Sequence, residues 1–185
     1  MNVITKTGFV VLGLILGGLA NSAVAGPGGI AINVGGGEDS IDLYRLDLVG
    51  NQWQRSWFEA GDWHVTGNWE LGLAAWDGDT NQGRHENLYE LSLTSVLRLQ
   101  PKVSGAWTPY VEGGVGVHLL SHTSVDQRDF GTALQFGSLI GTGLRFGDQN
   151  RFEIGYRYQH VSNASLNSDN DGMDFHMLRL AYYLP

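Results

Sequence analysis

Short segments in which apolar and polar residues alternate recur along this chain, and they constrain its fold more than any other feature. Side chains of a β-strand point alternately to its two faces, so such a segment predicts a strand with one apolar face. Eight of these segments follow residue 26, and each ends in a polar or glycine-rich loop. They cover roughly residues 30–34, 41–49, 63–76, 88–99, 110–120, 133–146, 151–163 and 172–184. The pattern predicts an all-β protein of eight strands.

The face opposite the apolar one distinguishes two kinds of eight-stranded barrel. In a soluble, lipocalin-like barrel, apolar side chains line the interior and polar ones face water. Here the polar set mixes both charges and is interleaved with glycine, which suits a narrow lumen packed with ion pairs. A polar lumen inside an apolar wall is typical of outer-membrane barrels, because closure leaves no unpaired backbone group in lipid. The charged members of the set are Arg45, Asp47, Glu70, Glu90, Arg98, Glu112, Arg145, Glu153 and Arg157.

Aromatic residues lie mostly towards the ends of the expected strands, where the interfacial girdles of membrane barrels are found. They are Trp63, Trp69, Trp76, Trp107, Tyr110, Tyr182 and Tyr183. The sequence therefore predicts an eight-stranded antiparallel transmembrane β-barrel with a polar lumen. We expect it in the outer membrane of a bacterium.

The N-terminus has the features of an export signal. Lys6 precedes an apolar run over residues 8–19, and residues 23–25 read Ala-Val-Ala. A basic residue, a short apolar run and an Ala-x-Ala ending are typical of a secretory signal peptide. The alternative, a membrane anchor helix, needs about twenty apolar residues. We predict a signal peptide over residues 1–25 and a single barrel domain over residues 26–185.

Composition argues against several kinds of partner. The chain has no cysteine, which removes disulfides and Cys-ligated metals. Its net charge is −8, and loss of residues 1–25 removes only one basic residue, Lys6, so nucleic acid is a poor partner. The 6 histidines show no metal-ligand spacing, and the loop 167–172 lacks the order of a calcium-binding loop. We predict no metal, no cofactor and no nucleic acid.

Three polar residues interrupt the apolar face of the last two expected strands. His160 and Ser162 continue the face that carries Phe152 and Ile154, and Asp174 shares the apolar face of the next strand. If both termini are periplasmic, residues 35–40, 77–87, 121–132 and 163–172 face outward, and these side chains meet the outer leaflet. A hydroxyl, an imidazole and a carboxylate form a charge-oriented nucleophile where geometry allows. The alternative is three polar residues at the membrane rim, where polarity costs little.

The region around these residues resembles the lipid A 3-O-deacylases of the PagL type, outer-membrane acyloxyacyl hydrolases. The resemblance covers essentially the chain after residue 25. It is carried by residues 160–164, Leu166, residues 170–172 and the acid two positions later, and further by Trp53, residues 56–57, 69–70 and 109–116, Trp76 and Gly78.

The resemblance implies an outer-wall esterase that removes the 3-position acyl chain of lipid A in the outer leaflet. Ser162 would be the nucleophile and His160 the general base. Asn163, Asn170 and backbone N–H groups near Gly172 would stabilise the oxyanion. The chain departs from the family in one respect, because Asp174 stands where the family has glutamate. Aspartate serves the same role in many triads, but it is one methylene shorter.

Two other functions remain open from the sequence. A non-catalytic structural or adhesin-type barrel needs only the alternation and the aromatic residues. An outer-membrane phospholipase would use the same chemistry on a glycerophospholipid. The sequence also leaves open the preferred acyl length, and whether the chain forms a homodimer.

Overall fold

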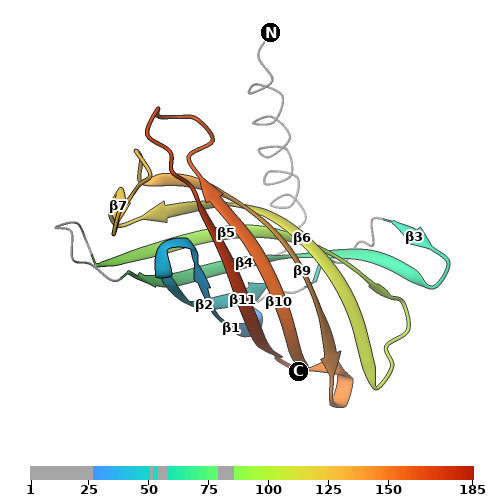
Figure 1. Ribbon diagram of the computed structural model, residues 1–185. Helices are drawn as coiled ribbons and strands as arrows, with labels where there is room; N and C mark the ends of the chain where they lie inside the picture. Colours follow the sequence, from blue (N-terminus) through green and yellow to red (C-terminus); the bar gives the residue numbers. More distant parts are fainter. Residues whose placement is uncertain (1–26, 51, 54–57, 79–85) are drawn as a thin grey trace, which may run out of the picture.

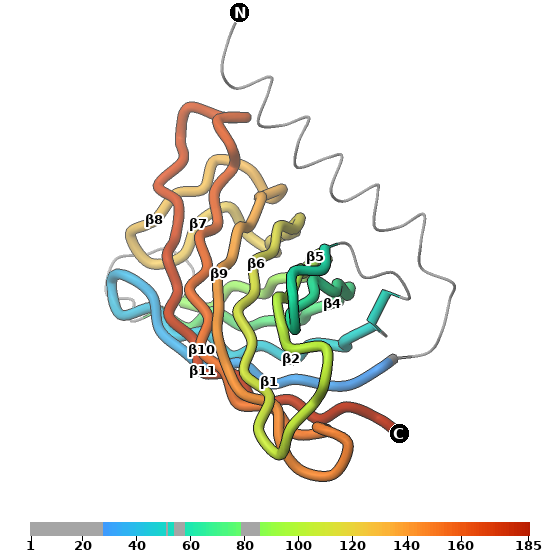
Figure 2. The backbone as a smooth tube through the Cα atoms, turned by 90° about the vertical axis from the view of Figure 1, so that its right-hand side faces the viewer, coloured from blue at the N-terminus to red at the C-terminus, as the bar shows by residue number. Residues whose placement is uncertain are grey.

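The computed structural model describes residues 27–50, 52–53, 58–78 and 86–185. The expected signal peptide, residues 1–25, lies outside these ranges. Within them the chain forms a closed barrel of long strands (Figures 1 and 2). The eight wall strands are β1 (Pro27–Gly37), β2 (Asp42–Gly50), β4 (Trp63–Asp77), β5 (Asn87–Pro101), β6 (Trp107–Leu120), β9 (Leu134–Phe146), β10 (Phe152–Ser162) and β11 (Met173–Tyr183).

Short elements complete the barrel. They are β3 (Glu59–Ala60), β7 (Ser124–Val125), β8 (Arg128–Asp129) and the 3-10 helices η1 (Glu38–Ser40) and η2 (Asp148–Asn150). No helix within the described ranges is long and apolar enough to cross a membrane.

Hydrogen bonding closes the barrel without a free edge among the wall strands. Their order is β2-β1-β11-β10-β9-β6-β5-β4, and β2 also pairs with β4. Each pairing is antiparallel. The eight-stranded antiparallel barrel expected from the alternation is confirmed.

The wall has the two faces that the alternation predicts. Outward side chains are apolar and exposed, as in Leu178, whose exposed fraction is 67%. The inward side chains form a continuous ion-pair network. Arg157 lies 2.6 Å from carboxylate oxygens of both Glu70 and Glu112, and Arg179 pairs with Glu70 and Glu153 at 2.8 Å. Because these buried arginines and glutamates meet opposite charges, their removal from water is compensated.

Three of the aromatic residues expected in the girdles lie inside the barrel instead. Trp76 is completely buried, and its Nε1 donates to Glu90 at 3.0 Å. Tyr110 is buried beneath the guanidinium of Arg98, and the Tyr183 hydroxyl donates to Glu153 at 2.7 Å. The girdle prediction was wrong for these three, because each shares its face with lumen residues of its own strand. Trp63 and Trp107 are exposed on the wall as expected.

One end of the lumen is closed by apolar side chains, which we call the lumen cap. Trp76 is at its centre and packs edge-on against Phe130 and Phe175, with ring centroids 5.7 and 4.7 Å apart. The other members are Ile41, Leu43, Ala74, Leu88, Leu120, Val125, Val161, Met173 and Met177. Val125 and Phe130 come from the segment containing β7 and β8, so this segment folds over the barrel end where β10 stops and β11 starts (Figure 1).

Candidate functional site

His160 and Asp174 face one another across neighbouring strands at the capped end of the barrel. Antiparallel pairing of β10 with β11 sets the two residues directly opposite. Nδ1 of His160 lies 2.6 Å from Oδ1 of Asp174, a length typical of a charge-assisted hydrogen bond. Their side chains are 46% and 33% exposed on the outer wall. With Nδ1 engaged, Nε2 is the ring nitrogen left to accept a proton.

Ser162 is the last residue of β10 and lies beside this pair. It is held on one side only, opposite Phe136 of β9, because the pairing with β11 ends at Val161. Among the described residues, no hydrogen bond links the Ser162 hydroxyl to His160. Gly172 lies beside both side chains. A Cβ added there would lie 3.3 Å from Cε1 of His160 and 3.8 Å from Cβ of Ser162.

Gly172 also needs to be glycine for a backbone reason. Its φ is +67°, a value that residues with a side chain rarely adopt. This conformation lets the chain turn into β11 beside the imidazole of His160. Within the described residues no acceptor is found for its N–H group.

Asn163 and Asn170 hold the loop that follows Ser162. Asn163 is fully buried, and its Nδ2 donates to the backbone carbonyl oxygens of Phe130 and Asp169 at 2.9 and 2.7 Å. Its backbone N–H donates to Oδ1 of Asn170 at 2.8 Å. In this arrangement Asn163 supports the site by fixing the loop, since its donors are already engaged. The amide nitrogen of Asn170 has no protein acceptor in the part of the chain that the structure describes.

A second group of polar side chains adjoins the pair on the outer wall. The hydroxyl of Tyr158 interacts with the carboxylate of Asp174, and its ring lies 5.3 Å from that of His176. Nδ1 of His176 is hydrogen-bonded to the hydroxyl of Tyr156 at 2.5 Å. These contacts engage His176 with tyrosines, and Asp174 with both His160 and Tyr158.

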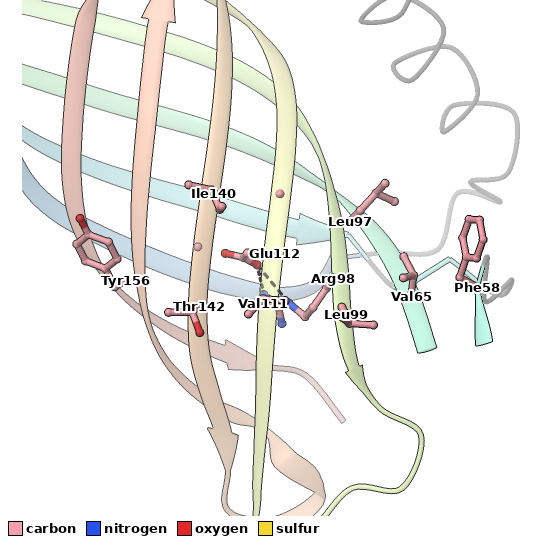
Figure 3. A pocket seen from close by; sticks show the side chains of 12 residues that line it. Phe58, Val65, Leu97, Arg98, Leu99, Val111, Glu112, Ile140, Thr142 and Tyr156 are labelled. Carbon is pink, nitrogen blue, oxygen red and sulfur yellow. Dashed lines mark hydrogen bonds and ion pairs between the residues drawn. The ribbon is translucent and has the colours of Figure 1, made fainter. Parts of the chain in front are cut away.

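An apolar groove of about 560 Å³ crosses the outer wall from β10 to β4 (Figure 3). Ile140 and Tyr156 line its end on β9 and β10, Leu97 and Val111 its middle, and Phe58 its far end. Tyr156 is four residues before His160 on the same face of β10. The groove therefore begins on the wall surface that carries the polar site.

The described residues contain no group of three or more His, Asp or Glu side chains placed to hold a metal ion. The chemistry available at the site is that of a hydroxyl, an imidazole and a carboxylate. This set serves nucleophilic attack on an acyl carbon and proton transfer to a leaving oxygen.

Fold and site together define a class: a bacterial outer-membrane β-barrel with a cluster of polar side chains on its lipid-facing wall. A family model described as "Lipid A 3-O-deacylase (PagL)" matches residues 43–183. The chain belongs to this family.

Similar proteins agree in sequence and in structure. Lipid A deacylase PagL of Pseudomonas aeruginosa is 33% identical over 150 residues, which cover 80% of this chain and 82% of that protein. Lipid A deacylase PagL of Bordetella bronchiseptica is 34% identical over 128 residues, 63% of this chain and 65% of that protein. The crystal structure of the outer membrane enzyme PagL has a TM-score of 0.74 at 29% identity, and the match covers 84% of this chain and 99% of that one.

Sequence reasoning missed two residues at the site. Tyr158 lies two residues before His160 on the same face of β10, and the strand register places it diagonally opposite Asp174. Arg128, which contacts the backbone at Gly172, lies in the short strand β8, within a segment where no alternation predicts contacts.

Proposed function

We propose that this protein removes the 3-O-linked acyl chain of lipid A in the outer leaflet of the outer membrane, acting as a serine ester hydrolase. The observation that carries the proposal is the hydrogen-bonded pair of His160 and Asp174 beside Ser162 on the lipid-facing wall. Membership of the lipid A 3-O-deacylase family supports the substrate. A lipid-facing site suits an ester whose chains stay in the membrane, since such a substrate reaches it by lateral diffusion.

The mechanism follows from the roles that the three side chains can take. Ser162 Oγ attacks the acyl carbonyl carbon while Nε2 of His160 accepts its proton. The tetrahedral intermediate collapses, the bond to the sugar oxygen breaks, and His160 returns the proton to that oxygen. Water activated by His160 then hydrolyses the acyl-Ser162 ester and releases the fatty acid. Asp174 accepts from Nδ1–H throughout and stabilises the imidazolium.

Attack requires the Ser162 hydroxyl to lie within hydrogen-bonding distance of Nε2 of His160. The oxyanion needs donors aimed at the carbonyl oxygen. The N–H group of Gly172 and the amide of Asn170 are the unengaged donors nearest in the chain, while Asn163 fixes the loop that carries them. The apolar groove offers a surface along which an acyl chain bound at Ser162 can extend.

Lipid A mass spectrometry tests the proposal directly. The wild type and Ser162→Ala are expressed in parallel in a deep-rough host, and folding is checked by the heat-dependent gel mobility of the barrel. We expect loss of one hydroxyacyl mass with the wild type alone. If Ser162→Ala deacylates lipid A as fast as the wild type, the proposal is wrong. If the product is lysophospholipid and lipid A is unchanged, the protein is a phospholipase instead. The site is built from one chain, and a homodimer stays an untested prediction.

A further inference from the structure

Arg128 joins three separate segments at the capped end of the barrel. From β8, its guanidinium contacts the carboxylates of Glu38 and Asp39 in η1 at 2.8 and 2.6 Å. The same side chain donates to the backbone carbonyl of Gly172 at 3.0 Å and approaches that of Asp171 at 3.4 Å. Residues far apart in the sequence thus meet on one side chain. We call this group of contacts the rim clamp.

The rim clamp acts on the backbone that lines the proposed active site. Gly172 lies beside His160 and Ser162, close enough that an added Cβ would touch both side chains, and its carbonyl accepts a hydrogen bond from Arg128. A second tie reinforces the first, because the N–H of Asp129 donates to Oδ2 of Asp171 at 2.6 Å, and the N–H of Asp171 donates to the carbonyl of Asp129 at 3.1 Å. The loop before β11 is therefore fastened to β8 at two adjacent residues.

Several features separate this cluster from an ordinary surface ion pair. The Arg128 side chain is only 16% exposed. Its single guanidinium forms ion pairs with two carboxylates and hydrogen bonds with two backbone carbonyls. Partial burial works to lower its pKa, but the hydrogen bonds and charges of Asp39 and Glu38 outweigh it and raise the pKa above the ordinary value. An isolated, exposed ion pair contributes about 0–1 kcal/mol to the stability of the fold. A network that orders a loop has a further effect, because it fixes the positions of the backbone groups in that loop.

We propose that Arg128 is a positioning residue for the ester hydrolysis, holding Gly172 and its N–H group in place against Ser162 and His160. This inference rests on the proposed function. Its physical basis is that oxyanion donors work by being fixed before charge develops, so a loosened loop lowers the rate of the chemical step. Within the part of the chain that the structure describes, the contacts of Arg128 are with Glu38, Asp39, Asp171 and Gly172, and none is with His160, Ser162 or Asp174.

The test compares two substrates on folded, purified protein in detergent: lipid A, and an uncharged ester such as p-nitrophenyl dodecanoate. The variants are Arg128→Met, Arg128→Lys and the double variant Glu38→Gln/Asp39→Asn. The control is Lys102→Met, which removes an exposed ion pair with Glu59 near the opposite rim. Removal of one oxyanion donor lowers kcat by about 100- to 1,000-fold in hydrolases, and loosening of its support should reach only part of that.

We expect Arg128→Met to lower kcat about 10- to 100-fold on both esters with KM little changed. Arg128→Lys should recover part of the rate. The double variant should have a kcat between those of Arg128→Met and the wild type, and Lys102→Met should match the wild type. A loss confined to lipid A, or a rise in KM alone, would mean that Arg128 binds a substrate phosphate, and the inference would fall. If Arg128→Met does not fold, the double variant decides by the same criteria.

Ser162→Ala separates the two claims. If it is inactive while Arg128→Met behaves like the wild type, only the positioning role fails. If Ser162→Ala hydrolyses both esters at the wild-type rate, the proposed catalytic site itself is wrong.

Discussion

Replacement of Asp174 by asparagine tests the catalytic arrangement with little change in shape. Nδ1 of His160 lies 2.6 Å from Oδ1 of Asp174, and the strand register holds the pair opposite one another. Asparagine keeps the size but removes the charge that stabilises an imidazolium, and its NH₂ group favours the wrong tautomer. In a comparable serine hydrolase triad this change lowers kcat about 10⁴-fold. Because both side chains here are partly exposed to solvent, we expect a loss of about 10²- to 10⁴-fold, or roughly 3–5.5 kcal/mol in activation free energy.

Stability should hardly respond to the same change. A pair this exposed contributes at most about 1 kcal/mol to folding, so the barrel should remain folded. The assay is release of fatty acid from lipid A in detergent at saturating enzyme, with heat-dependent gel mobility as the folding check. Asp42→Asn, at an exposed acid near the same barrel end, serves as the control. A folded Asp174→Asn protein within threefold of the wild-type rate would refute the role of Asp174. Asp174→Glu, the family residue, should stay within about tenfold.

Three further predictions concern the barrel. Arg157→Met takes one of two arginine partners from each of Glu70 and Glu112, which leaves an excess of buried negative charge in the lumen, and should destabilise the fold by about 3–5 kcal/mol, seen as a lower urea midpoint; an unchanged midpoint would contradict it. Leu178→Arg puts a charge on the lipid face at mid-strand and should cost about 2–4 kcal/mol on folding into vesicles, whereas Leu178→Ile should fold normally. Gly137→Val should prevent folding, because even a Cβ there would lie 2.1 Å from Nε2 of His118; a folded, heat-modifiable variant would refute the close packing.

The strands were predictable because their two faces meet different solvents. Wherever lipid faces one side and the lumen the other, side-chain polarity records the period of two along the strand. The ends were less predictable. The first strand reaches from Pro27 to Gly37, beyond the expected 30–34, because its flanking glycines pair in the ladder without side chains to reveal it.

The three misplaced aromatic residues show where polarity misleads. Trp76 has the same parity as Glu70, so the alternation alone placed it in the lumen. Its large aromatic side chain near a strand end pointed to the membrane interface instead. The lumen, however, is not polar throughout, because the lumen cap closes one end with apolar side chains. The position of a residue in the alternation predicted its face better than its residue type did. The alternation follows from backbone geometry, whereas residue type reflects only the average environment of that residue in many proteins.

Parity also explains which part of the site was predictable. It placed His160, Ser162 and Asp174 on the outer wall, and the strand register brought the first and third together. The loop contacts had no such signal. The pair formed by Arg128 and Asp39 joins residues 89 positions apart, and loops have no period from which such a contact could be inferred.

The division between wall and loop has a consequence for how the site works. The ladder fixes His160 and Asp174 from both strands, so their hydrogen bond needs no further support. Ser162, in contrast, is paired on one side only, with Phe136 of β9, because the ladder with β11 ends at Val161. The same break in pairing leaves the following loop without a ladder to hold it. Side-chain contacts hold this loop instead: Nδ2 of Asn163 donates to the carbonyls of Phe130 and Asp169, and Arg128 donates to that of Gly172.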